Sequence, residues 1–276
     1  MDLRQGKKYG LFLRRQGWVV DRMKDRTGKG FIQMAIRKLP LLPFSVMKCQ
    51  RFSMEPEEGQ LRRLKKMHRV IYSIWEPIDE EVENYCKRKK MERKLEGYLP
   101  AASLEIDLRL SKSRLWQDLD KDVKRVIRKL PDVKVEKVLG SRKRWEVWRS
   151  WRRSGKGYVP GYRAFESMAK SFGSDMWVMV VRNRDEIVAG EVILVSDKKA
   201  YYYHAWTTRQ GREMGAQTKL VWEGMIRARN AGLVTWDFEG INDGRRPRKS
   251  WAGFSRFKES FGGKRIIYPS SYRQWF

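Results

Sequence analysis

The residue types that carry most enzyme chemistry are scarce in this sequence. Its 276 residues include two cysteines, Cys49 and Cys86, and two histidines, His68 and His204. Neither pair has the spacing of a zinc site or of a thiol redox motif, so no metal is expected. So few histidines also argue against a hydrolase of the Ser-His-Asp type. We therefore first consider positioned cations and carboxylates as catalytic groups.

Two charged residues in the last quarter of the chain are candidates for that role. Asp237 lies at the end of an apolar run that predicts a strand at 234–238, where a carboxylate could receive a proton from an amine or orient it. Capping of the following turn is an equally good interpretation. Lys258 lies in a short predicted helix, and one such cation can stabilise the oxyanion of an acyl transfer. The alternative for Lys258 is a solvated surface lysine.

The elements that must position these residues form an α/β pattern in the second part of the chain. A strand is followed by helices, an antiparallel meander, a helix, a strand, a short helix and a last strand, which is typical of an N-acetyltransferase-like domain. One helix, starting at Ser111, has Leu115, Leu119, Val123, Val126 and Leu130 on one face. Another ends at Gly232. The pattern predicts strands at 104–108, 177–182, 187–195, 200–206, 234–238 and 264–268, and helices at 142–151, 164–172 and 216–231.

The first part of the chain looks like an abbreviated version of the same unit. Apolar runs predict strands at 18–23, 31–38 and 44–51, separated by turn residues. A basic helix follows, with its apolar positions extending from Leu61 through Val70 and Ile71 to Ile74. A small linker at 99–103 then marks the expected domain boundary.

Charge is the strongest compositional signal. The 61 lysines and arginines exceed the 33 acidic residues by 28, and the isoelectric point is near 10.3. Such an excess favours a polyanionic partner: nucleic acid first, an anionic membrane surface second. The sequence starts with polar residues and has no apolar run of about 18 residues. We therefore expect a cytoplasmic protein whose contact with the membrane, where it has one, is peripheral and at the inner face.

Several short motifs follow one another along almost the whole chain: QGW at 16–18, IRKLP at 36–40, EIDL at 105–108, KRVIRK at 124–129, LVWE at 220–223, WDFEGI at 236–241 and FKESFGG at 257–263. Together they resemble the Fem family of tRNA-dependent aminoacyltransferases, which build peptidoglycan interpeptide bridges. The last two motifs carry most of the specificity. After IRKLP the chain departs from the family pattern, in the half that the resemblance assigns to the acceptor.

The resemblance implies an α/β fold of two N-acetyltransferase-like (GNAT-like) domains with the acceptor in a cleft between them and no coiled-coil arm. The expected domains are 1–103 together with 264–276, and 104–263. It also implies peptide-bond formation on the amine of a lipid-linked or UDP-linked peptidoglycan precursor. Aminoacyl-tRNA is the expected co-substrate, with no further cofactor.

The site residues each have a simpler alternative. The resemblance implies a functional lysine at the position of Lys258, while Asp237 stays a catalytic candidate from its place at a strand end. Phe257, beside Lys258, could stack on the terminal adenine of the tRNA. The cations of a Gly/Arg-rich loop are expected to meet tRNA phosphates, although a charge run is more often a solvated face; they are Arg245, Arg246, Arg248 and Lys249. The diphosphate of the acceptor is expected at four basic residues, which could equally be surface side chains; they are Arg163, Arg37, Lys38 and Arg14.

Two other functions remain open from the sequence. An acyl-CoA N-acyltransferase would share the fold, but the R/Q-x-x-G-x-G/A pyrophosphate loop is broken, because Arg212–Gly215 is followed by Ala216 and Gln217. A non-enzymatic nucleic-acid-binding protein would explain the charge but not the ordered motifs. Trp145, Trp148 and Trp151 alternate with cations, which suits base stacking, but their helical spacing favours a core-packed face.

Overall fold

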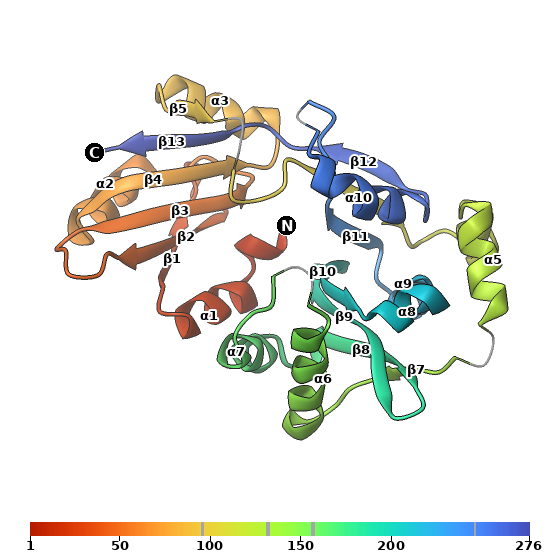
Figure 1. Ribbon diagram of the computed structural model, residues 1–276. Coiled ribbons are helices and arrows are strands. Elements are labelled where there is room, and N and C mark those ends of the chain that lie inside the picture. Colours follow the sequence, from red (N-terminus) through yellow and green to blue (C-terminus); the bar gives the residue numbers. More distant parts are fainter. Residues whose placement is uncertain (95–96, 131–132, 156–157, 246) are drawn as a thin grey trace. The chain divides into compact units, whose positions relative to one another are not determined.

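The computed structural model describes residues 1–94, 97–130, 133–155, 158–245 and 247–276. The chain divides into two compact units (Figure 1). Unit 1 comprises Met1–Ala101 with Ile267–Phe276, and unit 2 comprises Ala102–Ile266. Each unit combines one mixed sheet with helices, so both have the predicted α/β composition.

Unit 1 has a six-stranded sheet in the order β1-β2-β3-β4-β13-β5. Strands β1 to β3 are antiparallel, β3 and β4 are parallel, and β13 is antiparallel to β4 and β5. Phe52 and Tyr85 contact the buried Trp75 at the centre of its core. The elements are η1 (Leu3–Gln5), α1 (Lys7–Arg15), β1 (Val19–Lys24), β2 (Phe31–Lys38), β3 (Ser45–Phe52), α2 (Glu58–Met67), β4 (Val70–Pro77), α3 (Glu80–Arg88), β5 (Glu92–Lys94) and β13 (Ser271–Trp275).

The predicted basic helix of unit 1 is wrong in its second half. Helix α2 ends at Met67, and Val70, Ile71 and Ile74 lie on β4. Arg69 adopts a left-handed backbone with φ of 49°, which stops the helix. The residues beyond it are mostly β-branched or aromatic, and these types prefer a strand.

Unit 2 has a seven-stranded sheet in the order β12-β6-β11-β10-β9-β8-β7. Strand β11 is parallel to β10 and antiparallel to β6, and the other described pairs are antiparallel. The strands are β6 (Ala102–Asp107), β7 (Val135–Lys137), β8 (Met176–Asn183), β9 (Glu186–Ser196), β10 (Lys199–Thr207), β11 (Thr235–Gly240) and β12 (Lys264–Ile267). The helices are α4 (Lys112–Gln117), α5 (Lys121–Lys129), α6 (Ser141–Arg153), α7 (Tyr162–Phe172), η2 (Gly173–Asp175), α8 (Arg209–Met214), α9 (Ala216–Asn230), η3 (Lys249–Trp251) and α10 (Ala252–Glu259).

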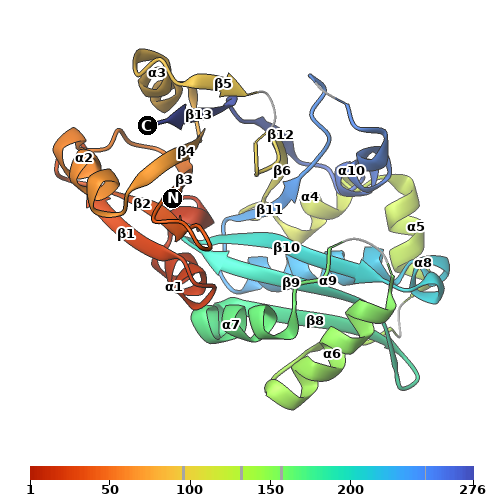
Figure 2. The same cartoon turned by 60° about the vertical axis from the view of Figure 1, so that its left-hand side comes forward.

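Helices cover both faces of this sheet, with α9 on one side and α6 and α7 on the other (Figure 2). Consecutive residues of β9 show the two faces. Gly190 lies against the ring of Trp206, which stacks on Trp151 of α6, whereas Glu191 faces Gly224 of α9. The apolar meander at β8 to β10 is therefore buried from both sides.

Two further expectations for unit 2 need correction. The helix from Ser111 is two helices, because the chain bends at Asp118–Asp120 and the Asp120 N–H donates to the Ser260 carbonyl. Trp148 and Trp151 are core residues as predicted, but Trp145 is 43% exposed and stacks on Trp148. Among the described residues, no helix is both long and apolar enough to cross a bilayer.

The return of the chain to unit 1 begins later than residue 264. Strand β12 remains in the sheet of unit 2 beside β6, and only β13 enters the sheet of unit 1. Gly263 makes this possible, since its φ is 103° and a Cβ there would lie 2.6 Å from the Glu105 carbonyl oxygen. The close approach of this glycine to β6 directs the next residues along that strand.

Candidate functional site

The parallel strands β10 and β11 separate after three paired positions. The pairs are Lys199 with Thr235, Ala200 with Trp236 and Tyr201 with Asp237. Beyond them β10 has a bulge between Tyr202 and His204, and the pairing of β11 with β6 shifts between Asp237 and Gly240. Glu239 has a left-handed backbone, with φ of 59°. The backbone after Asp237 is thereby turned out of the regular ladder, and its carbonyls can bind other groups.

The side chain of Lys258, from α10, binds this irregular stretch of β11. Its ammonium donates to the carbonyls of Phe238 at 2.7 Å and Gly240 at 2.6 Å. Its Nζ also lies 5.2 Å from the ring centroid of Phe254 and 5.9 Å from that of Tyr202. Burial lowers the pKa of Lys258 to about 8, against the attraction of Glu239 and Asp237. The side chain is thus a cation held in a fixed place, and not a solvated surface lysine.

Asp237 lies inside β11, and its carboxylate stabilises the bulge. Its Oδ1 accepts hydrogen bonds from the hydroxyl of Ser103 and from the backbone N–H of Glu239, the latter at 2.7 Å. Its Oδ2 is 3.8 Å from Nζ of Lys199. Burial, together with nearby Glu239, raises the pKa of Asp237 to about 7. The contact with the Glu239 N–H lies inside β11 and not in the turn that follows it, and the catalytic role stays a prediction.

The Gly/Arg-rich loop is attached to the helix that carries Lys258. The N–H of Asn242 donates to Ser255 of α10 at 2.7 Å. The Asn242 side chain also pairs with the Arg248 backbone, and Arg245 with Asp243. Arg245, Arg248 and Lys249 are exposed cations, while Arg246 lies outside the described residues. Three of the four predicted phosphate contacts therefore lie on a braced loop that follows β11.

Phe257 is partly buried, and its ring meets Phe261 edge-on at 5.3 Å. Phe261 is fully in the core, as the helix-face spacing predicts. Only the outer part of the Phe257 ring is therefore available to a base, so its stacking on adenine stays a prediction.

The four residues predicted to bind the acceptor diphosphate come from both units. Arg163 is an exposed residue inside the first turn of α7, and not before that helix as expected. In unit 1, Arg14 donates to the Val20 carbonyl at 2.7 Å, Arg37 lies 5.5 Å from the Trp18 ring, and Lys38 is exposed. Joint binding of one diphosphate by this set stays a prediction.

Sequence reasoning missed a buried carboxyl group in the same domain. Glu191 on β9 has no exposed surface, and neither of its oxygens has a hydrogen-bond partner among the described residues. Burial raises its pKa well above the usual range, which favours the neutral acid over the carboxylate. Gly224 makes room for it, since a Cβ there would lie 2.5 Å from Oε1. A lone glutamate in the apolar run at 187–195 was the available signal.

Glu191 predicts an unusual dependence of stability on pH. A carboxyl whose pKa is raised by folding stabilises the folded state fully below its unfolded pKa of about 4.3, and this contribution is lost as pH rises towards the folded pKa. Glu191→Gln removes that loss. We expect the variant to melt at a higher temperature than the wild type at about pH 7 and at a similar temperature at about pH 4.

Thermal unfolding followed by circular dichroism tests this expectation. Glu186→Gln is the matched control, because Glu186 is an exposed residue of the same strand. Its melting temperature should follow that of the wild type at both pH values. Equal changes in the two variants, or a Glu191→Gln change that is independent of pH, would rule out a buried neutral carboxyl.

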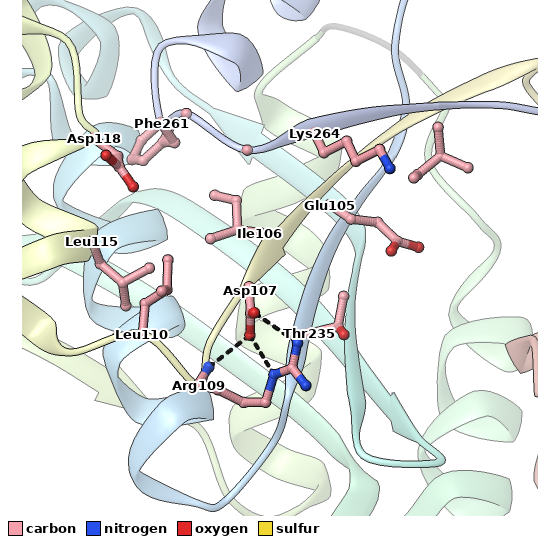
Figure 3. A pocket seen from close by; sticks show the side chains of 13 residues that line it. Glu105, Ile106, Asp107, Arg109, Leu110, Leu115, Asp118, Thr235, Phe261 and Lys264 are labelled. Atoms are coloured by element: carbon pink, nitrogen blue, oxygen red, sulfur yellow. Dashed lines mark hydrogen bonds and ion pairs between the residues drawn. The ribbon is translucent and has the colours of Figure 1, made fainter.

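Unit 2 also has an open cavity of about 600 Å³, between β6, β12 and α4 (Figure 3). Its apolar side includes Ile106, Leu110 and Leu115. Asp107 and Arg109 form an ion pair at its edge, with the closest atoms 2.8 Å apart. Neither Lys258 nor Asp237 lines this cavity, so it is separate from the stretch of β11 described above.

The comparisons with known proteins support one family. A family model described as an acetyltransferase (GNAT) domain matches residues 118–258, just over half of the chain. No curated protein matches. Among solved structures, one titled "Crystal structure of FemX" is similar to 100% of this chain over 92% of its own, with 14% identity and a TM-score of 0.83.

Two further structures show the same architecture. The C-terminal domain of a putative lysylphosphatidylglycerol synthetase from Agrobacterium fabrum covers 98% of this chain and 88% of its own, with 15% identity and a TM-score of 0.62. A tandem GNAT protein from the clavulanic acid biosynthesis pathway covers 94% and 83%, with 11% identity and a TM-score of 0.57. At such identities the likeness shows the fold, and the predicted α/β class with two GNAT-like units is confirmed.

Proposed function

Because the chain belongs to the acetyltransferase (GNAT) domain family, we propose that it transfers an acyl group to an amine, and that the group is an amino acid carried by tRNA. The proposed acceptor is the amine of a peptidoglycan precursor stem peptide. Aminoacyl-tRNA is then the co-substrate, and the reaction requires no further cofactor. The observation that carries this proposal is the fixed ammonium group of Lys258 where β10 and β11 separate.

The reaction asks little of the protein beyond placement and charge. The acceptor amine attacks the ester carbonyl of the aminoacyl-tRNA, a tetrahedral oxyanion forms, and the ribose hydroxyl leaves with a proton as the amide forms. An ammonium has three N–H donors, and the carbonyls of Phe238 and Gly240 accept two of them. The third can donate to the oxyanion. Because the other two donors fix the ammonium beforehand, its reorganisation during the reaction costs little.

A proton must also leave the attacking amine. Asp237 is the proposed acceptor for it, since its pKa of about 7 suits a general base near neutral pH, and the protonated carboxyl then passes this proton to the departing ribose oxygen. Its Oδ1 stabilises the bulge, so Oδ2, which lies 3.8 Å from the Lys199 ammonium, is the atom proposed for this role. Asp237 thus combines a structural contact with the proposed chemistry.

Two observations favour tRNA over coenzyme A as the donor. The net charge of +28 and the exposed cations of the loop after β11 suit a polyanion. The broken pyrophosphate motif ends helix α8, with Gly215 as its C-cap, so a helix stands where a phosphate-binding loop would be needed. An acyl-CoA N-acyltransferase is the second candidate, and the name of the matching family favours it.

The names of two structural neighbours agree with an aminoacyl group. FemX carries the name of the family that the sequence motifs resemble. A lysylphosphatidylglycerol synthetase is named for a product in which an amino acid is joined to a lipid. A peptidoglycan precursor as acceptor rests on the first resemblance, and Arg163, Arg14, Arg37 and Lys38 are its proposed phosphate ligands.

Retention of labelled donors on filters tests the proposed donor. We expect charged tRNA to be retained more tightly than duplex DNA of equal charge, and coenzyme A not to compete with it. Competition by coenzyme A at low concentration would instead support an acyl-CoA enzyme. Equal retention of tRNA and DNA would support a nucleic-acid-binding protein without this catalytic role.

A further inference from the structure

One end of the unit 1 sheet exposes a group of large apolar side chains, which we call the apolar end. They come from the β2–β3 loop, the last turn of α2 and the residues at the end of β13. Figure 1 shows the β2–β3 loop, α2 and the C-terminal end of the chain at the same end of this sheet. The exposed side chains are Leu41, Leu42, Phe44, Met67, Trp275 and Phe276.

Backbone contacts join these segments into one surface. The N–H of Ser45 donates to the Arg69 carbonyl, and the N–H of Phe276 donates to the Ile71 carbonyl, both at 3.0 Å. A shallow groove of about 330 Å³ runs between them. Its lining is Phe44, Arg62, Lys65, Lys66, Arg69, Val70, Ile71 and Phe276. The groove is therefore lined by both apolar and cationic side chains.

Leu41 is the most unusual residue of the apolar end. Its side chain is fully exposed, and its backbone is left-handed with φ of 62°. The N–H of Leu39 donates to the Phe44 carbonyl at 2.9 Å, which closes the loop around it. Asn, Asp or Gly would adopt this conformation more easily and would expose no apolar side chain to water. Because its side chain is fully exposed, Leu41 gains nothing from packing within unit 1 and is available to another surface.

All the charged residues that line the groove are basic. Four of its eight lining residues are cations, and none is acidic. Nζ of Lys65 lies 3.8 Å from the Phe276 ring centroid, so charge and apolar surface are in direct contact. Long cationic side chains beside exposed leucine, phenylalanine and tryptophan match the boundary between lipid headgroups and acyl chains.

We propose that the apolar end docks on the surface of an anionic phospholipid bilayer. Leu41 and Leu42 would enter below the headgroups, and Arg62, Lys66 and Arg69 would contact the anionic headgroups. Membrane binding of this kind gains both from buried apolar area and from attraction to anionic lipids. A nucleic acid would use the cations but has no need for exposed leucines. This proposal does not depend on the acyl-transfer reaction.

Flotation of the full chain with lipid vesicles tests the proposal. We expect binding to vesicles of phosphatidylcholine with phosphatidylglycerol, and little binding to phosphatidylcholine alone. Leu41→Ser with Leu42→Ser should weaken binding roughly tenfold or more for each leucine removed from the lipid. Arg62→Gln with Lys66→Gln should weaken it about 25-fold, since each cation near an anionic leaflet contributes about fivefold.

Matched controls separate this surface from general basic charge. Lys121→Gln with Lys129→Gln removes two exposed cations from α5, and Leu139→Ser removes an exposed leucine from unit 2. Both should bind vesicles like the wild type, and the Leu41 and Leu42 variant should retain tRNA normally. The proposal would be overturned if the α5 variant bound vesicles as weakly as the Arg62 and Lys66 variant, or if the wild type did not bind vesicles. It would also be overturned if the Arg62 and Lys66 variant lost tRNA retention but kept vesicle binding.

Discussion

Lys258→Met should lower kcat about 10²–10³-fold, the usual cost of losing one oxyanion donor. In the proposed reaction the ammonium matters only when negative charge grows on the attacked carbonyl. The values of kcat and kcat/KM should therefore fall together, while the Kd for charged tRNA stays unchanged. Steady-state kinetics with one aminoacyl-tRNA and one acceptor measures both constants.

The structure calls for a stability control in this experiment. Methionine leaves the carbonyls of Phe238 and Gly240 without their donor, at a cost of about 1–3 kcal/mol for each buried group. Activity must be measured well below the melting temperature of the variant. Lys264→Met, at an exposed lysine of β12, is the matched control and should keep wild-type kinetics.

The pKa of Lys258 adds a pH test with a defined sign. With a pKa of about 8, the cation is lost as pH rises through that value, so kcat should fall on the alkaline side. Lys258→Arg retains a cation and should move this decline to higher pH. A rise in KM alone, or near-wild-type kinetics for Lys258→Met, would show that this cation does not stabilise the transition state.

Binding of tRNA should weaken about 150-fold between about 50 and 200 mM salt, if four phosphates are neutralised at about −0.9 in logarithmic slope for each. The proposed contacts are Arg245, Arg246, Arg248 and Lys249. Filter binding across a salt series measures the slope directly. Arg248→Gln and Lys249→Gln should each reduce its magnitude by about one.

The control for this series is Lys29→Gln, at an exposed lysine of the β1–β2 turn in unit 1. Its slope should equal that of the wild type. A flat salt response would contradict a tRNA donor. If the loop variants kept the wild-type slope, tRNA would have to bind another basic surface.

The sequence predicts those elements whose residues form their own pattern. Strands β8 to β10 are continuous apolar runs with short polar turns, and α9 ends at Asn230, two residues before Gly232, which has φ of 76°. The apolar pattern predicts a helix over part of β4, because Leu61, Val70 and Ile74 fit a helical spacing by chance. The helix ends because Arg69 has a left-handed backbone, and the pattern of apolar residues gives no sign of that conformation.

The candidate site was predictable in its residue types but not in its contacts. Lys258 and Asp237 are visible in the motifs, yet the partners of Lys258 are carbonyls that become available only because β11 bulges at Glu239. Glu191 escapes a pattern search for a similar reason. Its surroundings come from Gly224 on α9 and from Tyr202 on β10, and only the folded sheet brings these positions together.

The most direct test of the proposed reaction is a single transfer assay with competing donors. Wild-type protein is incubated with pooled aminoacyl-tRNAs, acetyl-CoA and a muramyl pentapeptide precursor, and the products are identified by mass. We predict a precursor that has gained one amino-acid residue, formed only when charged tRNA is present and lost with Lys258→Met. An acetylated product formed from acetyl-CoA, with no aminoacylated precursor, would contradict the proposal.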